Sequence, residues 1–212
     1  MGKLFSYDSG IIQFLNKAVD CVALSFLWIV CCIPIITAGA ATTALYYTVN
    51  KVIVNERSHV WREYKSAFKS NFKQATIAWI PVLVMSYFLI TSGIIAFQEG
   101  WTPLLVVYIA VGCFVIMWSL HLFPHIARFQ NSTKQIMTNC AFLMFRHIFK
   151  SLGLLIVFAL GIIIVLGFFW VTMFIIPALY MIFASYVLEP MYERYMSEED
   201  LQAEEERNRR YY

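Results

Sequence analysis

Charged residues are scarce in this sequence and absent from long stretches of it. Only 14% of the 212 residues are charged, whereas 60% are hydrophobic. A soluble domain is usually about 25% charged and about 45–50% apolar. Residues 21–50 and 151–188 carry no charge, and Glu99 is the only charged residue within 74–127. Uncharged apolar runs of about 18 or more residues are typical of membrane spans, and they lack the polar face that a soluble helix needs.

Catalytic signatures are also missing. The sequence has no Gly-x-x-x-x-Gly-Lys-Ser/Thr loop, no Gly-x-Ser-x-Gly and no His-Glu-x-x-His, which are familiar patterns of nucleotide binding, serine hydrolysis and zinc proteolysis. No two cysteines have Cys-x-x-Cys spacing, which favours small apolar fillers over a metal centre or a disulfide framework. The five cysteines are Cys21, Cys31, Cys32, Cys113 and Cys140. We therefore expect no enzymatic activity, no cofactor, no metal and no nucleic-acid partner.

Few polar residues interrupt the apolar regions. His121 and His125 lie four residues apart, and Arg128 follows three residues later. A histidine pair at this spacing can bind a metal, but no carboxylate or third ligand is close in sequence, so interfacial hydrogen bonding is the favoured interpretation. Asp20 and Glu189 are expected at the ends of spans. No series of carboxylates lines the spans, which counts against an ion-coupled transporter.

The first apolar region, residues 18–54, is too long for one straight crossing of a core about 30 Å thick. Pro34 and Gly39 interrupt it, and a proline removes a helical hydrogen bond. We expect a span at 18–36, a turn at 37–40 and a shorter segment at 41–54. That last segment either returns across the bilayer or lies shallow in it.

Two further spans are expected at 75–97 and 101–123, joined by a tight turn at 98–100. The last apolar run, 151–188, is nearly twice as long as one crossing requires. It predicts a helical hairpin that turns near 167–172, with Pro177 kinking the final span.

The distribution of lysine and arginine predicts the orientation. Residues 51–73 contain six of them and residues 124–150 contain four, whereas the turn at 98–100 contains none. Because cytoplasmic loops are enriched in Lys and Arg, both basic connections and the C-terminus should be cytoplasmic. If 41–54 crosses, six segments place the N-terminus inside; otherwise five place it outside. Six membrane segments are favoured, because five would place Lys17 outside the cell, where lysine is less common.

The expected fold is therefore all-α: a polytopic transmembrane helical bundle of five to six membrane segments with two cytoplasmic amphipathic helices. A single transmembrane domain should cover residues 1–188, and a charged cytoplasmic tail should cover 189–212. The bilayer itself is the first expected partner.

One segment of the first basic connection is strongly amphipathic. Its two stripes repeat at helical spacing, so each occupies one face of a helix. The aromatic stripe is Trp61, Tyr64, Phe68 and Phe72, and the basic stripe beside it is Arg62, Lys65, Lys69 and Lys73. Two interpretations stay open: a helix lying on anionic lipid, or a docking helix for a cytoplasmic partner. Residues 129–135 resemble residues 68–74 in layout, which indicates a weak internal repeat.

The segment Cys-Ile-Pro-Ile-Ile-Thr-Ala-Gly-Ala-Ala-Thr-Thr-Ala-Leu-Tyr-Tyr, residues 32–47, resembles the hallmark segment of the YesL family of bacterial membrane proteins. Its core is Pro-x-x-Thr-x-Gly-x-x-x-x-Ala-Leu, from Pro34 to Leu45. Residues 68–75, Phe-Lys-Ser-Asn-Phe-Lys-Gln-Ala, are similar to the same family, and the likeness in length and span spacing covers nearly the whole chain.

The resemblance implies a multi-pass protein of a bacterial cell membrane. Members are often encoded beside ATP-binding-cassette carbohydrate importers, which implies an accessory subunit that associates with the permease subunits. An autonomous transporter or channel, or an assembly or regulatory factor, remains the alternative. The small-residue segment can pack against a partner helix or within this chain. Its candidate residues are Pro34, Thr37, Gly39, Thr43, Ala44 and Leu45.

Overall fold

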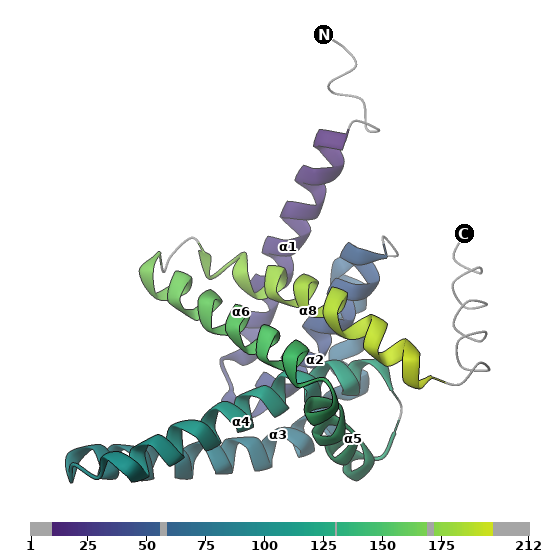
Figure 1. The fold of residues 1–212 in the computed structure, drawn as a ribbon. Helices are drawn as coiled ribbons and strands as arrows, with labels where there is room; N and C mark the ends of the chain where they lie inside the picture. Colours follow the sequence, from purple (N-terminus) through teal and green to yellow (C-terminus); the bar gives the residue numbers. More distant parts are fainter. Residues whose placement is uncertain (1–9, 56–58, 130, 169–171, 197–212) are drawn as a thin grey trace.

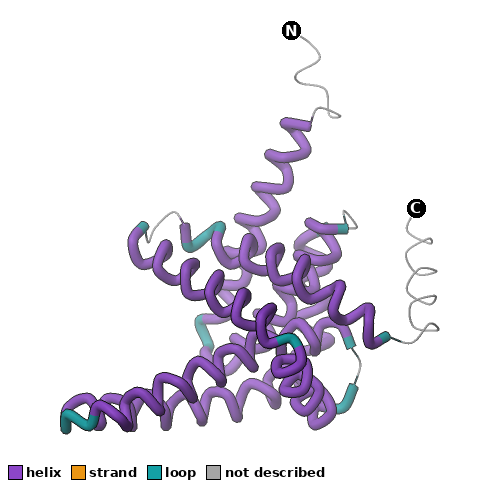
Figure 2. The backbone as a smooth tube through the Cα atoms, in the orientation of Figure 1, coloured by secondary structure: helices purple, strands orange, loops and turns teal. Residues whose placement is uncertain are grey.

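The computed structural model describes residues 10–55, 59–129, 131–168 and 172–196. Within those ranges the regular structure is helical throughout, with seven α-helices and short 3-10 and π segments between some of them (Figure 2). Four of the helices are long and apolar enough to cross a membrane. The expected all-α, membrane-type architecture is therefore confirmed, while the number of five to six segments stays a prediction.

The break predicted at Pro34 separates the first two helices. Helix α1 (Gly10–Cys32) ends before it, and a 3-10 turn, η1 (Ile35–Thr37), leads into α2 (Ala38–Thr48). The Thr37 hydroxyl donates to the carbonyl oxygen of Cys31 at 2.6 Å, which ties the turn to the end of α1. A π-helical segment, η2 (Val49–Val54), continues α2. At 11 residues, α2 alone falls short of the roughly 20 that a crossing needs.

Helices α3 (Val60–Gln98) and α4 (Thr102–Arg128) form a long hairpin. The tight turn predicted at 98–100 is present, and Gly100 adopts a φ of 71° there, a conformation that glycine accepts readily. The amphipathic helix and the span at 75–97 were expected to be separate. They are instead one helix of 39 residues, about 58 Å long, because nothing between Val60 and Lys73 breaks the helical pattern.

The remaining helices are α5 (Thr133–Arg146), α6 (Ile148–Gly167) and α8 (Ile176–Tyr192), followed by a 3-10 turn, η3 (Glu193–Tyr195). Ser132 begins α5 with a capping box to Gln135. Pro177 lies in the first turn of α8, where proline is tolerated, so it begins the helix rather than kinking it. Part of the hairpin turn expected at 167–172 lies outside the described residues.

Helix α8 continues through the expected domain boundary at 188. Met191 and Tyr192 are buried, so the packed body of the protein extends at least to the end of this helix. Residues 197–212 of the expected tail lie outside the described residues.

Several helices meet in one region of the molecule, which we call the base: α2, α5 and the adjoining ends of α4 and α8. From the base the outer part of the α3–α4 hairpin projects toward the lower left of Figure 1, and we call residues 84–112 the arm. Ala96 is the only buried residue of the arm. The base therefore contains most of the core, and the arm presents its side chains outward.

Candidate functional site

Polar side chains from three helices meet in the base. Each helix contributes residues three or four positions apart, which share one helical face. The members of this polar cluster are Tyr46 and Asn50 from α2 and η2, His125 and Arg128 from α4, and Ser185, Glu189 and Tyr192 from α8. Residues far apart in the sequence thus form one site.

Glu189 is the centre of the cluster. Its Oε1 accepts hydrogen bonds from the Tyr46 hydroxyl at 2.8 Å and from the Asn50 amide at 2.7 Å. Its Oε2 lies 3.2 Å from Nε of Arg128. The same Asn50 amide nitrogen also lies 2.8 Å from the Ser185 hydroxyl. One carboxylate therefore connects α2, α4 and α8.

The ion pair is largely shielded from water. The Arg128 and Glu189 side chains are only 20% and 17% exposed. Charges in such surroundings attract each other more strongly than on an open surface, but each costs several kcal/mol to desolvate. The geometry is therefore stable only while both partners and the surrounding donors are present.

Two aromatic groups complete the cluster. His125 and Tyr192 are 4% and 1% exposed, and their ring centroids lie 5.5 Å apart. Both packed rings also contact Phe129. Neither nitrogen of His125 nor the Tyr192 hydroxyl has a hydrogen-bond partner among the described residues. The cluster therefore has hydrogen-bonding capacity that these side chains leave unused.

His121 makes a different contact from His125. Its Nε2 lies 2.8 Å from the Ser151 hydroxyl, which joins α4 to α6, and both residues are fully buried. No group of three or more potential metal ligands occurs in the parts of the chain that the structure describes. Metal binding and hydrogen bonding were the two interpretations of the histidine pair, and for His121 the structure supplies a hydrogen-bond partner, Ser151.

A second ion pair joins η2 to the first turn of α3. Nζ of Lys51 lies 2.8 Å from Oε2 of Glu63 and donates to the Tyr47 hydroxyl at 3.3 Å. Between α5 and α6, His147 contacts the Tyr195 hydroxyl at 3.0 Å. Partial burial and the nearby cations Lys150, Arg146 and Arg194 lower the pKa of His147 from its usual range.

Most of the small-residue segment is packed inside this chain. Gly39, Thr43, Ala44 and Leu45 are buried, whereas Pro34 is exposed. A Cβ at Gly39 would lie 2.7 Å from Cβ of Trp79 and 3.0 Å from the Ala75 carbonyl oxygen, so glycine allows α2 to approach α3 closely. The sequence left open whether this segment packs against a partner helix or within this chain. These four residues pack within this chain.

The aromatic stripe divides into two pairs. Tyr64 is buried, and its hydroxyl lies 3.4 Å from the Ala41 carbonyl oxygen; Phe68 stacks on it and packs against the core. Phe72 and Trp61 are exposed, Trp61 by 65%. The whole basic stripe is exposed: Arg62, Lys65, Lys69 and Lys73.

Sequence reasoning missed the polar cluster because it placed Glu189 at the end of a span, as the first residue of a tail. A signal was present in the spacing. Ser185, Glu189 and Tyr192 repeat at helical intervals across the expected boundary, as His121, His125 and Arg128 do on α4. Matching those two polar faces would have favoured a contact between them.

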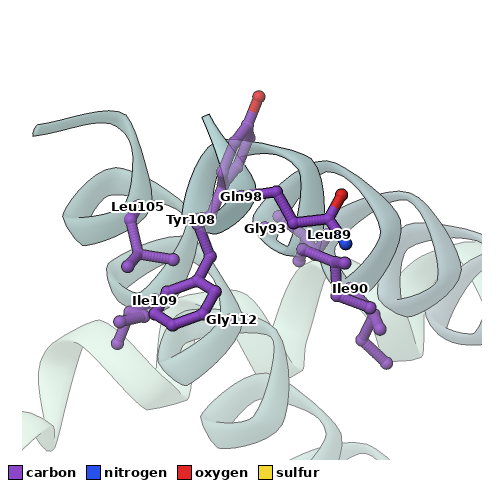
Figure 3. Close-up of a pocket in the computed structure, with 10 residues that line it drawn as sticks. Leu89, Ile90, Gly93, Gln98, Leu105, Tyr108, Ile109 and Gly112 are labelled. Atoms are coloured by element: carbon purple, nitrogen blue, oxygen red, sulfur yellow. The ribbon is translucent and has the colours of Figure 1, made fainter. Parts of the chain in front are cut away.

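The arm contains a shallow groove of about 460 Å³ near the hairpin turn (Figure 3). Its lining is almost entirely apolar and comes from both helices: Leu89, Ile90, Gly93, Ile94, Phe97 and Gln98 from α3, and Leu105, Tyr108, Ile109 and Gly112 from α4. A Cβ added at Gly93 or Gly112 would meet nothing within 4 Å.

Residues 21–92 match a family model described as "Protein of unknown function, DUF624". The matched part runs from the middle of α1 through α2 into the arm, and it includes the small-residue segment and both stripes of α3. No curated protein matches the chain, and no solved structure does either.

Proposed function

We propose that this chain is a YesL-type membrane protein that accompanies the permease subunits of an ATP-binding-cassette carbohydrate importer, with its basic end in the cytoplasm. Two findings support the assignment. The segment at 32–47 resembles the YesL hallmark, and the family match covers that same segment. The proposed role is non-catalytic: the chain binds and stabilises the permease within the bilayer.

The observation that carries this proposal is the arm. Its residues are mostly apolar, many of the large ones are exposed, and it consists of α3, α4 and the turn between them. Gly93 and Gly112 leave open backbone along its groove. Small residues of this kind allow a neighbouring transmembrane helix to approach closely, and packing of that kind drives association within lipid. A permease helix fits this surface.

The polar cluster supports a structural role in the same protein. Glu189 is bonded to three other helix-borne side chains. A carboxylate bound in this way fixes the arrangement of α2, α4 and α8, from which the arm projects. The base therefore orients the surface that the permease would contact.

The experiment is copurification of the tagged full chain from native bacterial membranes. Wild-type protein should recover the permease subunits, and filling the groove with Gly93→Leu and Gly112→Leu should reduce their recovery about tenfold. Gly153→Leu is the matched control, because a Cβ there also meets nothing within 4 Å but lies on α6. Recovery of the protein alone, together with normal glycan uptake in a deletion strain, would refute the proposal.

The partly buried Arg128–Glu189 ion pair favours one alternative, an autonomous transporter or channel. Ionisable residues enclosed between the helices of a membrane protein often mark ion or substrate pathways, and the Arg128 and Glu189 side chains are enclosed among α2, α4 and α8. Reconstitution into liposomes separates the two functions. An accessory subunit moves no solute by itself, whereas a transporter gives a flux that Glu189→Gln abolishes.

A further inference from the structure

The basic stripe on α3 points away from the rest of the protein. At 3.6 residues per turn, Lys69 lies on the side of the helix opposite the buried residues Tyr64, Ala67 and Ala75, whereas Lys65 lies at the edge of that side, about 100° from Tyr64. Both lysines are exposed, and so is Lys73 one turn further along. The three ammonium groups therefore form one continuous, outward-facing positive surface.

This surface differs from that of a helix that lies on lipid. Such a helix inserts its apolar face among the headgroups and acyl chains. On α3 the middle of that face is already occupied: Tyr64 contacts α2, and Phe68 packs against buried core residues. Trp61 and Phe72, at the two ends of the aromatic stripe, stay exposed, so the helix lacks the continuous apolar face with which a surface helix binds lipid.

The length of α3 gives a second, independent argument. Residues 75–97 are about 34 Å long and fill the hydrocarbon core. Lys65 lies about 12 Å beyond Lys73 along the same continuous helix. The headgroup layer is only about 5–7 Å thick on each side. Even if the helix is tilted by about 40° from the bilayer normal, Lys65 lies roughly 9 Å further from the bilayer centre than Lys73 does. The outer part of the stripe therefore stands in water.

We infer that the stripe of Lys65, Lys69 and Lys73 is a docking surface for an acidic surface of a cytoplasmic protein. Complementary charge supplies the attraction, and the exposed ring of Trp61 beside the stripe supplies the kind of anchor that dominates protein interfaces. The inference rests on the proposed cytoplasmic orientation but not on the importer, so a failed permease copurification leaves it standing.

The first test measures binding of a fluorescent oligoglutamate peptide to the full chain in phosphatidylcholine nanodiscs. Binding should weaken with added salt, and K65E/K69E should weaken it about tenfold. K65R/K69R should retain it, which also reports on folding. The matched control is K134E/K150E, since Lys134 and Lys150 are also exposed, on α5 and α6. Equal loss in the control, or no loss in K65E/K69E, overturns the inference.

The second test identifies the occupant in living cells. A photoreactive residue replaces Ser66, which is exposed and directly follows Lys65 in the sequence. The expected product is a crosslink to an Asp- and Glu-rich peptide of another protein, formed by wild type and lost in K65E/K69E. Three outcomes overturn the inference: a phospholipid adduct, a crosslink to the acidic residues 198–206 of this same chain, or a protein adduct that survives the charge reversal.

Discussion

The base and the arm use the same apolar composition in opposite ways. In the base, helices surround polar side chains, and Glu189 binds groups from three directions. In the arm, two helices contact each other along one edge and turn large residues such as Phe88 outward. Within lipid, apolar side chains gain little by packing against protein rather than acyl chains. Polar contacts and close backbone approach must therefore determine which helices meet.

This comparison explains how one chain can hold a defined shape and still present a large adaptable surface. The base has specific hydrogen bonds and a glycine contact, so a change there should alter stability. The arm has few internal contacts, so a change there should alter association. Substitutions matched between the two regions can test this division.

Glu189→Ala should have a large effect, lowering the free energy of unfolding by about 3 kcal/mol. It leaves the Arg128 guanidinium without its carboxylate in largely shielded surroundings. Thermal unfolding followed by circular dichroism in detergent measures the loss. Glu193→Ala is the control, because Glu193 is exposed one turn later, and it should change stability by less than about 0.5 kcal/mol.

The same site allows a double-mutant cycle. Arg128→Leu combined with Glu189→Ala removes both charges, so the pair should cost at least about 1 kcal/mol less than the sum of the single changes. Strict additivity would mean that the ion pair contributes nothing to the base.

Gly39→Ala compares the close helix contact of the base with an open position in the arm. The added Cβ would meet Trp79 and a backbone carbonyl oxygen, so α2 and α3 must separate, at a cost of about 2 kcal/mol. Gly93→Ala has no such neighbour and should leave stability equal or slightly higher, because alanine favours helix. Equal melting temperatures for the two variants would contradict the contact.

Ser151→Ala should cost less, about 1 kcal/mol, because it removes the hydroxyl that bonds to a buried histidine ring. Ser119→Ala is the control. Among the residues that the structure describes, its hydroxyl bonds to a carbonyl of its own helix, so its loss should be barely measurable by the same melting experiment. If Ser119→Ala lowered the free energy of unfolding as much as Ser151→Ala, the hydrogen bond between α4 and α6 would not account for the loss.

Sequence alone predicted the features of this fold that depend on composition and on local breakers. The uncharged runs predicted helices of membrane type, Pro34 predicted the break after α1, and Gly100 lies in the predicted hairpin turn. Each signal acts through neighbouring residues. The continuity of α3 was missed for the same reason. A change in composition near residue 74 indicated a boundary, although the helical period continues across it.

The polar cluster was harder to predict, since it depends on contacts between distant parts of the chain. Tyr46 and Glu189 are 143 residues apart in sequence. Helical spacing shows which polar residues share a face, but not which two faces meet. The small-residue segment illustrates the same difficulty: its composition fits a partner helix or an internal one, and only the position of Trp79 against Gly39 distinguishes them.

Phe88→Ala tests the arm and should have the smallest effect on stability. Phe88 is 62% exposed, so its truncation in the isolated protein should change the free energy of unfolding by less than about 0.5 kcal/mol. Leu122→Ala, at a fully buried position of the base, should cost about 3 kcal/mol in the same melting experiment. The order should reverse for association. Phe88→Ala should reduce recovery of the permease subunits from native membranes, whereas the folded fraction of Leu122→Ala should recover them normally. If both variants lose stability and association together, the arm is part of the folded core and has no separate role in binding.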